Sequence, residues 1–169
     1  HKYMTFFDQT GELIKVSTPV KRIVSIVPSQ TEFLYDIGLD EEVVGITKFC
    51  IHPKEWFNTK TRVGGTKTVD FETVKALKPD IIIGNKEENE KENIEALRSI
   101  APVFMSDIID RSDAEVMMMQ IALMTGKGRE TREIIDSING GFRRLNRTKS
   151  PKKILYFIWR NPWMLAGKN

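Results

Sequence analysis

The chain has 169 residues, a formal net charge of +3 at pH 7 and one cysteine, Cys50. This length suits one ordinary domain or slightly more. The weak positive charge lacks the dense Lys/Arg cluster of a nucleic-acid interface, so no nucleic-acid partner is expected. A single cysteine excludes an internal disulfide. No apolar run approaches the roughly 18 residues of a membrane-spanning helix, and the first residues do not begin a signal peptide.

The chain begins with a predicted hairpin. Residues 5–8 and 13–16 flank Gln9-Thr10-Gly11, which predicts two short strands joined by a turn and covering an edge of the sheet.

The next unit is a strand that leads directly into a helix. Ile23–Val27 is a β-branched apolar run, typical of a strand buried on both faces of a parallel sheet. Ser29-Gln30-Thr31-Glu32 has the spacing of a capping box and predicts a helix start there, and Gly38 suits its end. Ligands of open α/β sheets gather outside the carboxyl ends of the strands, so residues 29–31 are expected to face that crevice.

The middle of the chain alternates short strands and helices, which predicts an α/β fold with a Rossmann-like parallel sheet flanked by helices. The predicted elements, in order, are a strand at 43–47, a loop at 48–53, the loop Gly64-Gly65-Thr66-Lys67, a helix at 71–77 capped by Asp70, a strand at 80–84, a loop at 85–89, a helix bearing Ile94, Leu97 and Ile100, and a strand at 102–105.

From Ser112 the pattern becomes helical. One helix is interrupted at Gly126, and a second is predicted over about 129–146. A strand is predicted at 153–158, and since a lone strand is unstable in water, a second lobe, another copy of the chain or an edge of the first sheet must cover it. The predicted division is an α/β lobe at 1–111, a helical linker at 112–150 and the start of an incomplete second lobe at 151–169.

Four segments together resemble a known family. They are RIVSIVPSQTEFLYDIGL, VVGITKFCIHP, TRVGGTKTVDFETVKALKPDIIIGNKEEN and KKILYFIWRNPWM. They are similar to the amino-terminal lobe, linking helix and first second-lobe strand of the helical-backbone (class III) substrate-binding proteins of ABC importers. The resemblance implies two lobes joined by one long helix, with a cobalamin, haem or iron–siderophore ligand held between them. From the uncovered strand at 153–158 we expect self-association, or weak ligand binding because half of the cleft is absent.

The resemblance places the ligand against the ends of the strands. The ligand-binding residues that it implies are Ser29, Gln30, Thr31, Lys48, Phe49, Cys50, Gly65, Thr66, Lys67, Asn85 and Lys86, with Trp159 and Arg160 closing the cleft from the other side. Aromatic rings stack on flat ligands, and lysine and arginine favour anionic groups, which agrees with an anionic metal chelate.

Two further positions matter within the resemblance. Glu72 matches an acidic residue by which family members dock onto the membrane permease, so a permease is the expected partner. Cobalamin binders of the family carry tryptophans where this chain has Thr66 and Asn85, which puts cobalamin in question. The family implies a periplasmic or otherwise extracytoplasmic location, peripheral to the membrane, and the lack of a signal peptide in this chain leaves a cytoplasmic location open.

Other interpretations of these residues remain open. The Gly64–Lys67 loop lacks Walker spacing, so a plain turn is favoured over a nucleotide cradle, although a small α/β enzyme with a phosphate-bearing cofactor is the alternative. An intracellular carrier or sensor on the same fold is a third hypothesis. Cys50 and His52 are too few for a metal site, and no catalytic residues, resident metal or cofactor are expected. Residues 86–93 are interpreted mainly as a solvated helix start, and Glu72 as an ordinary early-helix carboxylate without the resemblance.

Overall fold

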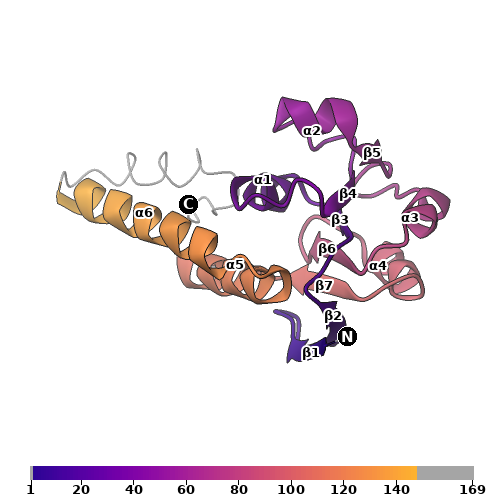
Figure 1. The fold of residues 1–169 in the computed structure, drawn as a ribbon, viewed down its shortest axis with the longest axis horizontal. Coiled ribbons are helices and arrows are strands. Elements are labelled where there is room, and N and C mark those ends of the chain that lie inside the picture. The colour runs from indigo at the N-terminus through magenta and orange to yellow at the C-terminus, as the bar shows by residue number, and fades with distance from the viewer. Residues whose placement is uncertain (1, 148–169) are drawn as a thin grey trace.

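The structure, a computed structural model, describes residues 2–147. Within that range it has a hairpin, a parallel sheet and six helices (Figure 1). The strands are β1 (Lys2–Phe7), β2 (Leu13–Thr18), β3 (Ile23–Ser25), β4 (Val43–Ile46), β5 (Thr61–Arg62), β6 (Ile81–Asn85) and β7 (Val103–Ser106). The helices are α1 (Pro28–Asp36), α2 (Lys54–Thr59), α3 (Phe71–Leu77), α4 (Lys91–Arg98), α5 (Arg111–Thr125) and α6 (Gly128–Arg147).

The sheet has five parallel strands in the order β5-β4-β3-β6-β7. The chain leaves β3 through α1 to β4 on one side, and later crosses back to β6 on the other side of β3. The strand order therefore reverses next to β3. In open α/β sheets the crevice at such a reversal, outside the carboxyl ends of the strands, is where ligands bind.

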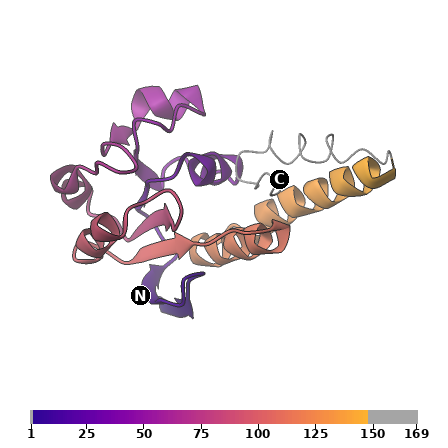
Figure 2. The same ribbon diagram turned by 180° about the vertical axis from the view of Figure 1, so that it is seen from behind.

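Alternate residues of each central strand enter two different cores. Ile23, Ile81 and Ile83 join the core made with α1, α5 and Ile138 of α6, whereas Val24 and Ile82 join the core made with α3 and α4. The strands are buried on both faces, as the β-branched runs predicted. α1 and α5 thus cover one face of the sheet, with α6 packed against α5, and α3 and α4 cover the other face (Figures 1 and 2).

The hairpin is fastened to the free edge of the sheet, as expected. The carboxylate of Asp8 accepts a hydrogen bond from the backbone N–H of Met105 in β7 at 3.0 Å, and the side-chain oxygen of Gln9 accepts one from Asp107 at 3.0 Å. The backbone N–H of Gln9 also donates to the carbonyl of Met105 at 3.2 Å. These bonds cover the edge of β7, where unpaired backbone groups would otherwise face solvent.

The predicted start of α1 is wrong in one detail. The helix begins at Pro28 with Val27 as its N-cap, and no side chain caps it, so Ser29 and Glu32 do not form a capping box. Proline suits the first helical position because its missing N–H would lack a partner there in any case. The end of the helix is as predicted, since Gly38 follows the C-cap Ile37 with a φ of 82°.

The later elements agree with the sequence pattern. Asp70 caps α3, with its carboxylate accepting a hydrogen bond from the N–H of Thr73 at 3.1 Å. The helix expected over about 129–146 is present as α6, which extends beyond the body of the sheet (Figure 1). The strand predicted at 153–158 lies outside the described residues. That strand, the three-part division of the chain and self-association stay predictions.

Candidate functional site

The candidate site lies at the carboxyl ends of the parallel strands. Four loops meet there, because parallel strands end at the same edge of the sheet. They follow β3, β4, β5 and β6, and hydrogen bonds between their side chains and backbone groups hold them together.

A buried network joins the ends of β3 and β4. The hydroxyl of Thr31 donates to the hydroxyl of Ser25 at 2.8 Å and lies 3.2 Å from the sulfur of Cys50. The sulfur also lies 3.1 Å from the hydroxyl of Thr47. Burial raises the pKa of the Cys50 thiol, and the hydrogen bonds from the two threonines only partly oppose this. Cys50 is therefore a neutral structural thiol that fixes the loop after β4 against α1.

A second network joins α1 to the ends of β6 and β7. The side-chain amides of Gln30 and Asn85 both donate to the hydroxyl of Ser106, the latter at 2.9 Å. The Ser106 hydroxyl in turn donates to the carbonyl of Gly84 at 3.2 Å. The side-chain oxygen of Gln30 is buried and has no hydrogen-bond partner among the described residues. Ser106 thus connects the end of β7 to α1 and to the end of β6.

Phe49 presents an exposed ring at this edge. Its side chain is 53% exposed, and the ammonium of Lys48 lies 5.2 Å from the ring centroid. The ring lies close to the backbone of Gly65, where an added Cβ would be 3.0 Å from its Cε2 atom. The N–H of Lys48 donates to the carbonyl of Gly64 at 2.8 Å, so the two loops support each other.

The site carries charged side chains of both signs, and two of its lysines lack an ion pair among the described residues. Lys48 and Lys67 have no ion pair within the part of the chain that the structure describes, whereas Lys86 lies 3.5 Å from the carboxylate of Asp107. Glu88 lies in the same loop as Lys86, and burial raises its pKa. The exposed ring of Phe49, with the ammonium of Lys48 beside it and Lys67 on the loop after β5, can attract an anionic, flat ligand.

The structure separates the expected site residues into three groups. Gln30, Thr31 and Cys50 are buried, and Gly65 is buried beneath Phe49. Ser29, Thr66 and Asn85 are half-buried at the edge, and Lys48, Phe49, Lys67 and Lys86 are exposed. Trp159 and Arg160 lie outside the described residues.

Sequence reasoning missed four polar residues of the two networks and their surroundings. They are Ser25, Thr47, Ser106 and Asn89, all of them buried. Asn89 and Asn93 donate hydrogen bonds to the Gly64–Lys67 loop, called the glycine loop below. The segment 86–93 is therefore more than a solvated helix start. The available signal was a polar residue at or just after the end of an apolar strand, which Ser25, Thr47 and Ser106 share.

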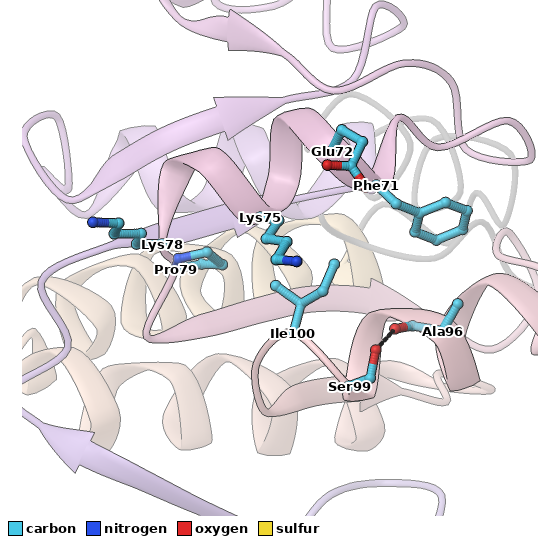
Figure 3. A pocket seen from close by; sticks show the side chains of 8 residues that line it. All are labelled: Phe71, Glu72, Lys75, Lys78, Pro79, Ala96, Ser99 and Ile100. Carbon is cyan, nitrogen blue, oxygen red and sulfur yellow. Dashed lines mark hydrogen bonds between the residues drawn. The ribbon is translucent and has the colours of Figure 1, made fainter.

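Glu72 lies in the first turn of α3, the helix that follows the loop after β5. It is exposed and lies beside an open groove of about 500 Å³ between α3 and the end of α4. Figure 3 shows Phe71, Glu72 and Lys75 on one side of this groove and Ala96, Ser99 and Ile100 on the other. The surface beside Glu72 therefore offers both apolar and charged groups.

None of the helices between residues 2 and 147 is long and apolar enough to cross a membrane. The same part of the chain contains no group of three or more His, Cys, Asp or Glu side chains that could hold a metal ion.

Comparisons with known proteins agree with this architecture. An uncharacterized ABC transporter substrate-binding lipoprotein of Bacillus subtilis (strain 168) is 35% identical over 83 residues, which are 49% of this chain and 26% of the relative. A vitamin B12-binding protein of Vibrio cholerae is 30% identical over 96 residues, which are 57% of this chain and 34% of the relative. The chain thus spans 26% and 34% of the lengths of these two relatives.

A solved structure has the same fold. The petrobactin-binding protein of Bacillus subtilis superimposes with a TM-score of 0.80 at 21% identity, covering 88% of this chain and 54% of that one. A family model described as periplasmic binding protein matches residues 23–169, which is most of the sequence. From this match, the chain belongs to the periplasmic binding protein family.

Proposed function

We propose that this chain is the cargo-binding lobe of an ABC-importer receptor, which binds a metal chelate and delivers it to a membrane permease. The observation that carries the proposal is the meeting of four loops at the carboxyl ends of the strands, with Phe49, Lys48 and Lys67 exposed there. The names of the vitamin B12-binding protein and the petrobactin-binding protein support this class of cargo, and that of the substrate-binding lipoprotein supports a role with an ABC transporter.

The residues of the proposed site fall into those that would contact the cargo and those that would hold the loops in place. Ser29, Lys48, Phe49, Thr66, Lys67, Asn85 and Lys86 would contact the cargo, because their side chains are exposed or half-buried. Gln30, Thr31, Cys50 and Gly65 would act from beneath by fixing the loops. Trp159 and Arg160 stay proposed contacts of the opposite side.

The charge and the ring favour an anionic chelate. Lys48 and Lys67 would pair with carboxylates or catecholate oxygens, and Phe49 would stack on a flat group. An iron–siderophore or a haem has both features. Corrinoid binding stays within the proposal, although Thr66 and Asn85 offer no aromatic face to a corrin ring.

Glu72 is the proposed docking residue for the permease. A carboxylate on an exposed helix start is well placed to meet a basic partner surface, and such rim charges mainly set orientation and association rate. The same proposal places the protein outside the cytoplasmic membrane and peripheral to it, which the lipoprotein relative supports.

A binding role is favoured over catalysis. The family and the compared proteins are binding proteins. The alternative of an enzyme with a phosphate-bearing cofactor predicts saturable nucleotide binding at the glycine loop instead. An intracellular carrier would bind the same chelates without a permease.

Equilibrium dialysis against four chelates tests the proposal. The panel is a ferric tris-catecholate, a ferric hydroxamate, haemin and cyanocobalamin, with ATP and NAD as the nucleotide controls. We expect saturable binding of at least one chelate, recovered chemically unchanged, and none of either nucleotide. Binding of none of the four chelates would overturn the proposal, and saturable nucleotide binding in its place would favour the enzyme alternative.

A further inference from the structure

Asn89 connects three segments of the site with one side chain. It is 7% exposed, and its Oδ1 atom accepts a hydrogen bond from the backbone N–H of Asn85 at 2.8 Å. Its Nδ2 group donates to the carbonyl of Ile26 at 3.3 Å and to that of Thr66 at 3.2 Å. The end of β3, the glycine loop and the loop after β6 therefore meet on one buried amide.

Asn93 repeats this contact one position further along the glycine loop. It lies in the first turn of α4, and its Nδ2 group donates to the carbonyl of Lys67 at 2.8 Å. Two asparagines four residues apart thus hold the consecutive carbonyls of Thr66 and Lys67. The path of the glycine loop is set from the side of α4.

The close approach of Asn89 also accounts for Gly84 in β6. A Cβ at position 84 would lie 3.1 Å from the Oδ1 atom of Asn89 and 2.9 Å from the sulfur of Met105. Contacts this tight would force Asn89 or Met105 to move. Glycine leaves the space that the asparagine needs.

The glycine loop supports the exposed residues Lys48 and Phe49 of the site. The carbonyl of Gly64 accepts a hydrogen bond from the backbone N–H of Lys48, and the ring of Phe49 lies beside Gly65, where an added Cβ would be 3.0 Å from its Cε2 atom. A displacement of this loop would therefore shift Lys48 and Phe49. The amide of Asn89 is suited to prevent it, because this side chain is buried and shielded from competing water.

We propose that Asn89 and Asn93 are positioning residues, which fix the glycine loop and, through it, place Phe49 and Lys48 for cargo binding. The claim about cargo rests on the proposed function. The claim about the loop stands on the hydrogen bonds alone, and the two are tested separately.

Three variants isolate the amide donors. Asn93→Asp removes one donor, and Asn93→Gln restores it on a longer side chain. Asn89→Asp keeps the acceptor for Asn85 but removes both donors. Asn58→Asp is the matched control for added charge, because this exposed asparagine of α2 makes no side-chain hydrogen bond to the described residues.

Native-state hydrogen exchange, followed by NMR, tests the loop. We expect the amides of Gly65 and Lys48 to exchange about tenfold faster in Asn93→Asp and Asn89→Asp, while the Ile82 amide in the core stays at the wild-type rate. Asn93→Gln should return to the wild-type pattern. Equal acceleration of all three amides would show a merely structural role, and no acceleration would show no role; either overturns the claim.

Dialysis with a ferric tris-catecholate tests the consequence for cargo. Asn93→Asp should weaken binding about tenfold and Asn93→Gln should restore it, with Asn58→Asp unchanged. Unchanged binding in Asn93→Asp, despite faster loop exchange, would overturn the positioning of the cargo contacts. If the wild-type protein binds no chelate of the panel, the proposed function fails, and the exchange result still decides the claim about the loop.

Discussion

The hydroxyl of Thr31 in α1 and the thiol of Cys50 after β4 lie 3.2 Å apart in the interior. This contact joins α1 to the loop after β4 through two residues 19 positions apart in the sequence. Neither side chain is on the surface. Buried polar side chains therefore lie beneath the exposed residues of the site. Removing the hydrogen-bond partner of such a buried group strongly destabilises the folded state.

Replacing the thiol of Cys50 should therefore lower the stability of the folded protein. We expect Cys50→Ala to lower the free energy of unfolding by about 1–2 kcal/mol, because two buried hydroxyls each lose a partner and a small cavity forms. Cys50→Ser should lose less. Urea unfolding followed by circular dichroism measures both. A Cys50→Ala protein as stable as wild type would show that the network contributes nothing.

Gly65→Ala should change the site with little effect on the fold. Its Cβ would lie 3.0 Å from the Phe49 ring, which is 53% exposed and free to move aside. We expect weaker binding of a ferric tris-catecholate, with the free energy of unfolding within about 0.5 kcal/mol of wild type. Gly128→Ala is the control, since nothing lies within 4 Å of its added Cβ. Equal binding by the two variants would remove Phe49 from the proposed contacts.

Glu32 should make stability depend on pH. Burial, together with the charge of Asp36, raises the pKa of Glu32 from 4.5 to about 7. Between these values the folded state holds a proton that the unfolded state releases, so this group lowers stability as pH rises through the window.

The variant Glu32→Gln cannot ionise. Its melting temperature should therefore exceed that of wild type at about pH 8, above the window. At about pH 4, below the window, the two melting temperatures should differ less. Thermal melts across this range measure the effect. Glu41→Gln, at an exposed turn residue, serves as the control. A constant difference between Glu32→Gln and wild type at all pH values would exclude a titrating Glu32.

Glu72→Lys should separate docking from binding. We expect chelate affinity to be unchanged, because Glu72 belongs to the groove at α3 and α4 and not to the loops of the site. Delivery to a permease in reconstituted vesicles should fall, since the reversed charge opposes a basic partner surface. Glu55→Lys, in the first turn of α2, is the matched control. Transport at the wild-type rate by Glu72→Lys would remove this residue from docking.

Much of the fold follows from local pattern. The apolar runs at Ile23–Val27 and Ile81–Ile83 predicted strands buried on both faces, which are present in β3 and β6, although β3 ends at Ser25. Asp70 marks the start of its helix through its own side chain. Where local signals competed, sequence reasoning failed. The polar run at Ser29 predicted a capping box, but Pro28 already fixes the first helical turn one residue earlier.

The candidate site divides in the same way. The sequence by itself determined which loops lie at the carboxyl ends of the strands, because strand direction and order of elements dictate the edge at which each loop emerges. Only the tertiary structure decided which residues reach the surface and which lie beneath it. Thr31 and Cys50 are neutral polar residues in loop-like sequence, yet both are buried, while Asn89 looks solvated and holds three segments. The physical reason is that hydrogen bonds between distant segments depend on positions in space, which one-dimensional spacing does not contain.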